Sequence, residues 1–204
     1  MAAADHQQIG ALDGTKQQIL DVARHLFSDR SYLGVSMSEI AARLGITKAA
    51  LYYHFSGKRE IYEGVLEEAL ADLHGLLEAD GEPFAPGERL RYMVGRYLEF
   101  GIREKNLINA LVTKLSPAES GLRAFVCAAR DDIVDRFRRA IDDALASSRL
   151  LGVIDSRLAA TMLTAMMDGL IVEHSFLERT LDPDRVSREI VAILGLDAGR
   201  PATP

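Results

Sequence analysis

The sequence predicts an all-α protein, with an N-terminal three-helix helix-turn-helix domain and a larger C-terminal helical bundle. Apolar residues recur three and four positions apart through most of the 204 residues, which is the spacing of one face of an α-helix. No segment of useful length alternates apolar and polar residues as a strand would. Apolar residues make up 48% of the chain, enough to bury a core in one small and one larger domain.

The first helix is expected from about Lys16 to Ser28. Its apolar residues recur at helical spacing and would support the following helices from behind: Ile19, Val22, Ala23, Leu26 and Phe27. The preceding segment, MAAADHQQIGALDG, lacks the basic and apolar parts of a signal peptide. Residues 1–14 are therefore expected to form a flexible tail, and residues 15–64 the first domain.

The second helix is predicted to start after Ser36. Ser36 and Glu39 form a capping box, in which each side chain satisfies a backbone amide at the start of the helix. Ile40 and Leu44 give the helix a buried stripe. Gly45 then ends it, because glycine adopts a positive φ at little cost and lets the chain reverse within a few residues.

A third helix follows the turn, with Thr47 as its N-cap. Leu51 and Phe55 are four apart and would bury one face. The other positions are then free to face a partner: Thr47, Lys48, Ala49, Ala50, Tyr52, Tyr53 and His54. Donors, phenols and small methyl-bearing residues suit the major groove of DNA. The alternative is an ordinary helical hairpin with a solvated outer face.

The segment from Thr15 to Leu66 resembles the N-terminal domain of the tetracycline-repressor (TetR) family of transcription regulators. The run LYYHF followed by Lys58 is the most specific part of the resemblance. The sequence departs from the family pattern at Ser31, where glycine is usual, and at Gly57, where a capping residue is usual; Ser56 is expected to cap the fourth helix instead. Double-stranded DNA contacts are expected from Ser36, Thr47, Lys48, Ala49, Tyr52, Tyr53, His54 and Lys58.

Individual roles can be argued for some of these residues. Lys58 lies in the first turn of a helix, where its ammonium and the free backbone amides would hold a phosphate. Lys48 suits either a guanine edge or a phosphate, and Tyr52 suits either packing on the second helix of the domain or contact with DNA. Ala49 would touch a thymine methyl or permit close approach.

The net charge of −6 belongs to the second domain. Residues 1–64 contain seven Lys or Arg and seven Asp or Glu, whereas residues 65–204 contain seventeen against twenty-three. Without the tail, residues 15–64 carry a net charge of +2. The sequence therefore permits DNA binding by the first domain and predicts that weak non-specific binding is lost at moderate salt.

The rest of the chain reads as helices. A long fourth helix is expected over Lys58–Glu78, and residues 80–87, DGEPFAPG, break the pattern. Further helices are expected at Glu88–Lys105, Leu107–Leu115, Ala118–Arg149, Ser156–Arg179 and Pro183–Leu194. The second domain, residues 65–197, would bind a ligand and dimerise, and residues 198–204 would form a flexible tail.

The last two helices carry stripes that are typical either of a core or of a subunit interface. Resemblance to the TetR family implies a four-helix homodimer contact, in which small residues allow the helices to pack closely. Two motifs related by a two-fold axis would read both halves of a palindromic operator. The expected interface residues are Thr161, Ala165, Asp168, Gly169, Val172, Phe176, Ile190 and Leu194.

The resemblance also implies a pocket for a small effector among the middle helices. These helices carry apolar and adaptable side chains that would either form core or line such a pocket, and Asn109, Thr113 and His174 are its possible polar anchors. The apolar and aromatic residues of the set are Tyr92, Met93, Tyr97, Phe100, Leu111, Phe125, Met162 and Met166. The effector would be small and apolar or amphipathic. Neighbouring Glu173 and His174 point in different directions on a helix, so no metal site is expected, and no cofactor.

The function expected is that of a TetR-type repressor, released from its operator by an effector. The alternatives are a helix-turn-helix regulator without an effector and a helical enzyme. The sequence lacks a glycine-rich phosphate loop, a G-x-S-x-G elbow and an H-E-x-x-H pair, which argues against an enzyme. Cys127 is expected to be a buried structural thiol rather than a redox sensor. The absence of a long apolar segment indicates a cytoplasmic protein without a membrane partner.

Overall fold

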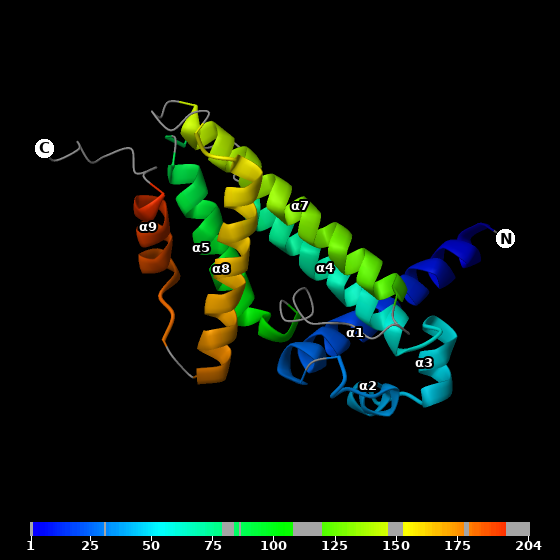
Figure 1. Ribbon diagram of the computed structural model, residues 1–204. Coiled ribbons are helices and arrows are strands. Elements are labelled where there is room, and N and C mark those ends of the chain that lie inside the picture. Colours follow the sequence, from blue (N-terminus) through cyan, green and yellow to red (C-terminus); the bar gives the residue numbers. More distant parts are fainter. Residues whose placement is uncertain are drawn as a thin grey trace, which may run out of the picture. The chain divides into compact units, whose positions relative to one another are not determined.

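The protein is all-helical in the part of the chain that the structure describes. The structure is a computed structural model that describes residues 2–30, 32–78, 84–85, 87–107, 120–146, 153–177 and 180–194 (Figure 1). Two compact units divide the chain, Met1–Leu70 and Ala71–Pro204. Within the described ranges there is no strand, so the predicted fold class is confirmed. The helices of these ranges are all too short or too polar to cross a membrane.

The first unit contains α1, α2, α3 and the first part of α4. Their bounds are Ala2–Arg30 for α1, Met37–Leu44 for α2, Lys48–His54 for α3 and Lys58–Leu77 for α4. The last three match the expected helices, but α1 begins well before Lys16. Residues 2–14 are thus helical where the sequence predicts a tail, and their run of alanines, the best helix former, accounts for the difference.

The core of the first unit draws on all four helices. The fully buried apolar residues include Ile19, Ala23, Phe27, Ile40, Leu51, Ile61 and Val65. The ring of Tyr62 meets that of Phe27 edge to face, with centroids 4.8 Å apart, and that of Tyr32 at 4.7 Å. These aromatic contacts tie α4 to α1 and to the loop before α2.

The reversal between α2 and α3 depends on a left-handed residue. Gly45 has φ 68° and ψ 24°, and its backbone N–H donates to the last turn of α2. The amide of Ile46 also donates, to the carbonyl of Ala41 at 3.0 Å. Both bonds satisfy carbonyls that a helix end leaves unpaired, so the predicted helix end at Gly45 is confirmed.

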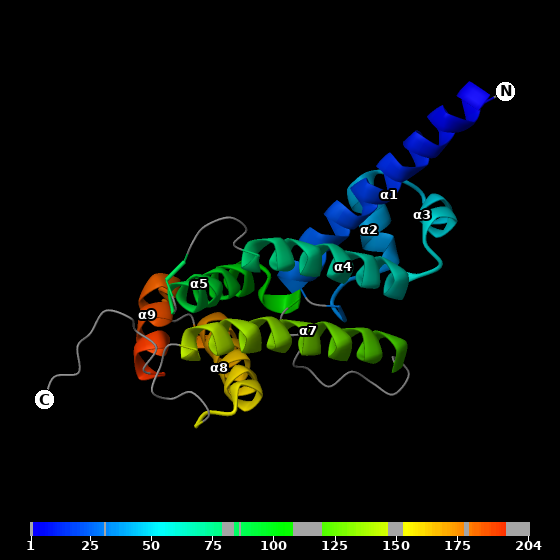
Figure 2. The same ribbon diagram turned by 90° about the horizontal axis from the view of Figure 1, so that it is seen from above.

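In the second unit, α5 packs against three other helices. The bounds are Glu88–Arg103 for α5, Ser120–Leu145 for α7, Ser156–Leu177 for α8 and Pro183–Ile193 for α9. Helix α5 contacts α7, α8 and α9, and α7 also contacts α8 (Figures 1 and 2). Residues 108–119 lie outside the described ranges, and with them most of the helix expected over Leu107–Leu115; residues 195–204, including the expected C-terminal tail, also lie outside.

Replacing Gly45 by alanine should lower the free energy of unfolding by about 1–2 kcal/mol, because an L-residue is strained at φ 68° although a Cβ would meet nothing within 4 Å. Gly75→Ala is the matched control. A Cβ at Gly75 also meets nothing within 4 Å, but the residue is in α4, where alanine should be neutral or stabilising. Urea unfolding of both variants measures the difference, and equal stabilities would contradict the role given to Gly45.

Candidate functional site

The N-terminus of α2 is held by half of the expected capping box. The Ser36 hydroxyl accepts a hydrogen bond from the amide of Glu39 at 3.3 Å, as predicted. The Glu39 carboxylate, however, forms an ion pair with Arg30 at the end of α1 instead of reaching back to Ser36. The ion pair therefore joins α1 to the start of α2, and the Ser36 hydroxyl hydrogen stays available to a partner.

Helix α3 has a buried face and an exposed face. The Thr47 hydroxyl accepts from the amide of Ala50 at 3.1 Å, which confirms the predicted N-cap. Leu51 and Phe55 are buried. The exposed residues are Thr47, Lys48, Ala49, Ala50, Tyr52 and Tyr53. One side of α3 is thus fixed to the unit, while the other presents the polar and aromatic residues that the sequence singled out.

The aromatic part of this face is accessible. Tyr53 is 74% exposed and Tyr52 51% exposed. The rings of Tyr53 and His54 meet edge to face with centroids 5.2 Å apart, and His54 is half-buried. About half of the Tyr52 side chain is therefore accessible to a partner, and the rest packs against the unit. This is compatible both with a packing role and with a DNA contact.

Lys58 has partners inside its own unit. Its Nζ donates to the carbonyl of Tyr32 at 2.9 Å and to that of Val35 at 3.0 Å, and lies 4.3 Å from the centroid of the Tyr32 ring. Two of the three ammonium donors are therefore used to hold the loop between α1 and α2. The expected phosphate contact stays a prediction, and it would have to use the third donor.

Glu60, in the first turn of α4, holds Ser56, the residue that was expected to cap this helix. The backbone amide and the hydroxyl of Ser56 both donate to Glu60 Oε2, at 2.6 and 2.7 Å. These two bonds hold the pKa of Glu60 below its ordinary value. Ser56 does not act as the expected cap, because its hydroxyl donates to Glu60 and no amide of the first turn of α4 donates to it.

The described residues among those expected to line an effector pocket differ in burial. Met93, Tyr97 and Phe100 are buried in α5. Met162 and Met166 lie on the exposed side of α8, at 64% and 45% exposure. Tyr92, Phe125 and His174 are half-buried, and Asn109, Leu111 and Thr113 lie outside the described residues.

The residues expected at a dimer interface divide between two faces of α8 and α9. Thr161, Ala165, Gly169 and Val172 are exposed on α8, next to the exposed Leu158, Met162 and Met166. Asp168 and Ile190 are buried within the chain itself and do not lie on this exposed face. Leu194 is half-buried, and the side chain of Phe176 lies outside the described part.

Asp168 belongs to a buried polar network that joins three helices. Its carboxylate accepts a hydrogen bond from the Tyr97 hydroxyl at 2.6 Å and forms an ion pair with Arg130. Arg130 also donates to the hydroxyl of Thr164 at 3.3 Å. Burial, with the Asp168 charge beside it, raises the pKa of Tyr97 well above its ordinary value. The network explains why an acid lies inside: its charge is paired and its oxygens accept hydrogen bonds.

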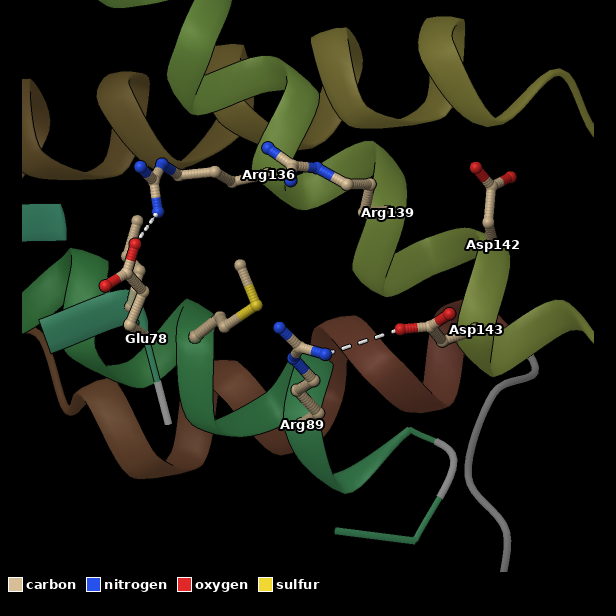
Figure 3. A pocket seen from close by; sticks show the side chains of 8 residues that line it. Glu78, Arg89, Arg136, Arg139, Asp142 and Asp143 are labelled. Carbon is tan, nitrogen blue, oxygen red and sulfur yellow. Dashed lines mark hydrogen bonds and ion pairs between the residues drawn. The ribbon is translucent and has the colours of Figure 1, made fainter. Parts of the chain in front are cut away.

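Two pockets of the second unit that described residues line are charged rather than apolar. One, of about 540 Å³, lies where the end of α4 meets α5 and α7 (Figure 3). Another, of about 330 Å³, lies between α5 and α9. Met93 lines the first and Tyr92 the second, the only two of the expected residues among these linings.

Two further expectations concern metal and thiol chemistry. Within the described ranges, no group of three or more His, Cys, Asp or Glu side chains is placed to hold a metal ion. Cys127 is exposed on α7, so the expectation of a buried thiol was wrong. Its apolar neighbours Phe125 and Val126 turn to other sides of the helix, which the sequence pattern alone did not separate.

Comparison with known proteins gives the family of each unit. Residues 19–65 match the family described as bacterial regulatory proteins, tetR family. Residues 84–172 match the family described as tetracyclin repressor-like, C-terminal domain. The HTH-type transcriptional regulator AcrR of Shigella flexneri is 27% identical over 188 residues, which make up 88% of this chain and 87% of AcrR.

Two solved structures resemble most of the chain. AibR, in a crystal structure with isovaleryl coenzyme A and operator DNA, is 25% identical, with a TM-score of 0.67 over 87% of this chain and 96% of AibR. The transcriptional regulator FadR of Bacillus subtilis, in complex with stearoyl-CoA, is 18% identical, with a TM-score of 0.72 over 91% of this chain and 99% of FadR. AcrR and FadR are transcriptional regulators and not enzymes. With a helix-turn-helix unit and a regulatory unit that both match, the chain belongs to the TetR family of transcription regulators.

Proposed function

We propose that the protein is a homodimeric repressor that binds a palindromic operator through α3 and is released by a small effector. The observation that carries the proposal is the division of α3 into a buried face, Leu51 and Phe55, and an exposed face that ends in Tyr53. A helix held in this way can enter a major groove without disturbing its own core. The proposed place of action is the cytoplasm, where the operator lies.

The proposed DNA contacts differ in kind. Lys48, in the first turn of α3, is exposed and can reach a guanine or a phosphate. Tyr53 offers a phenol donor to a phosphate oxygen. Ala49 and Ala50 are exposed and small, so they allow the helix to approach the base edges. Ser36, Thr47, Tyr52, His54 and Lys58 complete the proposed contact set.

The exposed face of α8 supports homodimer formation. Leu158, Met162, Met166 and Val172 are large apolar residues on this face, and Ala165 and Gly169 lie between them. Ile193 of α9 is also exposed, at 80%. A contiguous apolar surface of this kind is typical of a protein interface. A second copy would cover it and would supply the second half-site reader.

Helix α4 provides the proposed link between effector and DNA. It is continuous from Lys58 to Leu77, and the boundary between the two units falls after Leu70. Its first turns therefore belong to the DNA-binding unit and its last turns to the regulatory unit. An effector that favours one arrangement of the last turns would shift the population of operator-binding dimers.

Selection of the purified dimer against random duplex DNA should recover a palindromic site. Lys48→Ala and Tyr53→Phe should each weaken binding to that site by about tenfold or more, because each removes a donor in both half-sites. Fluorescence anisotropy at several salt concentrations measures the affinities. Lys105→Ala, an exposed charge change in the regulatory unit, is the control. The selection is run both without and with a panel of apolar compounds and isovaleryl coenzyme A. Failure to enrich a DNA site under either condition would contradict the proposal.

Lys58→Met should lower the free energy of unfolding by about 1–3 kcal/mol, since it leaves the carbonyls of Tyr32 and Val35 without their charged donor. Arg59→Met is the matched control, because Arg59 makes only an exposed pair with Glu63. If Lys58 also contacts a phosphate, the slope of log affinity against log salt should fall by about 1 per contact. A stable variant with an unchanged slope would remove both roles.

Ala165→Glu should convert the dimer to a monomer and abolish operator binding, because the carboxylates would be buried opposite each other at the proposed interface. Ala128→Glu places the same charge on an exposed position of α7 and should leave the dimer intact. Light scattering coupled to size-exclusion chromatography measures the mass. A dimeric Ala165→Glu variant would place the interface elsewhere.

A further inference from the structure

The charged pocket of the regulatory unit has an apolar floor. Leu77 at the end of α4 and Met93 of α5 are both buried and line it. Its volume of about 540 Å³ is within the range of small-molecule sites. Arginine side chains reach the same hollow from two helices, Arg136 and Arg139 from α7 and Arg89 from α5 (Figure 3).

The acids of the lining already have partners. Glu78 accepts from Arg136 at 2.7 Å, and Asp143 pairs with Arg89 at 3.4 Å. The third acid, Asp142, is paired with an arginine outside the lining, Arg138, at 2.8 Å. Each acid of the lining therefore has a guanidinium within ion-pair distance, although Arg136 and Arg138 are each shared with a second acid.

Arg139 is different. Its hydrogen bond runs from Nε to the backbone carbonyl of Asp135, at 3.3 Å. Among the described residues it has no carboxylate within ion-pair distance. The lining holds three arginines and three acids, and Arg139 is the arginine among them that has no acid partner.

We propose that this pocket binds an amphipathic organic anion, whose carboxylate or phosphate pairs with Arg139 and whose short apolar part lies on Leu77 and Met93. A guanidinium binds either group through two parallel N–H donors, and a neutral apolar compound would leave it unpaired. This inference names the ligand class for the proposed effector and rests on the proposed function only for the regulatory consequence.

The same anion competes with Glu78 for Arg136. Arg136 lines the same pocket as Arg139 and is shared between Glu78 and Asp132. Glu78 directly follows α4, and its amide closes the last turn on the carbonyl of His74 at 2.9 Å. The Arg136 guanidinium holds the pKa of Glu78 below its ordinary value, as expected for a formed pair.

Competition would loosen the end of α4. Two polar contacts between described residues join this end to α7: Glu78 with Arg136, and His74 with Asp132 at 2.8 Å. An anion that draws Arg136 away from Glu78 removes one of the two. The ligand would then act on the helix that the two units share, which is where a regulatory signal has to arrive.

The test uses the full-length dimer and four probes of matched chain length: hexanoate, monohexyl phosphate, 1-hexanol and hexylammonium. Isothermal titration calorimetry without DNA measures binding at millimolar concentrations. At least one anion should bind, and the neutral and cationic probes should not. Binding of hexanoate alone would identify a carboxylate ligand, and binding of monohexyl phosphate alone a phosphate ligand.

Three variants make the test specific. Arg139→Gln should weaken anion binding by about tenfold or more, whereas Arg123→Gln, an exposed arginine elsewhere on α7, should not change it. Glu78→Gln should tighten anion binding severalfold, because the competing carboxylate is gone. Circular dichroism of each variant confirms that it is folded.

Three results would overturn the inference: neither anion binds the folded wild-type dimer, 1-hexanol binds as well as the anions, or Arg139→Gln binds the anions as tightly as wild type. Operator affinity without any probe is measured in parallel. A dimer that binds its operator but none of the anions refutes the ligand class and leaves the regulator intact. A dimer that binds an anion but no DNA refutes the proposed function instead.

Discussion

The reversal at Gly45 is the constraint on which the DNA-binding unit depends. With φ at 68°, the chain turns tightly enough for Leu51 of α3 to be fully buried. Tyr53 lies on the opposite side of the same helix and is therefore 74% exposed. The other end of α2 is held independently, by the Ser36 cap and by Lys58, which binds the carbonyl of Val35 just before that cap. Both ends of α2 are therefore fixed, and α3 takes its direction from α2.

The motif could be predicted from the sequence because its signals are local. The Ser36 cap, the glycine turn and the Thr47 cap each involve residues at most a few positions apart, and the structure has them as predicted. The role of Lys58 could not be predicted in this way. Its acceptors lie 23 and 26 positions earlier in the chain, in a loop whose carbonyls carry no sequence signature. The motif thus placed Lys58 in the first turn of α4, but only the fold shows that its ammonium binds the carbonyls of Tyr32 and Val35.

The regulatory unit was harder to predict because α8 has two usable faces. Met167 and Ile171 are buried against the unit, whereas Met162 and Val172 are exposed. Helical spacing identifies such stripes but does not show what each of them packs against, so Asp168 was placed with the interface residues. Only the positions of Tyr97 and Arg130, on other helices, show that its charge is paired inside. A helix with two apolar faces needs partners on both sides, and within the described chain α5 and α7 cover only one side of α8.

Net charge is equally a poor guide to what each site attracts. The chain carries −6, mostly from its second unit, yet the carboxylates of α7 are largely paired with arginines of the same helix, as Asp135 and Asp142 are with Arg138. Such pairs remove charge locally without changing the total. The charge that a given site offers to a ligand therefore depends on which of its charged residues has no ion-pair partner. In the pocket by α4 that residue is Arg139, so an acidic unit can still offer an unpaired guanidinium to a small anion.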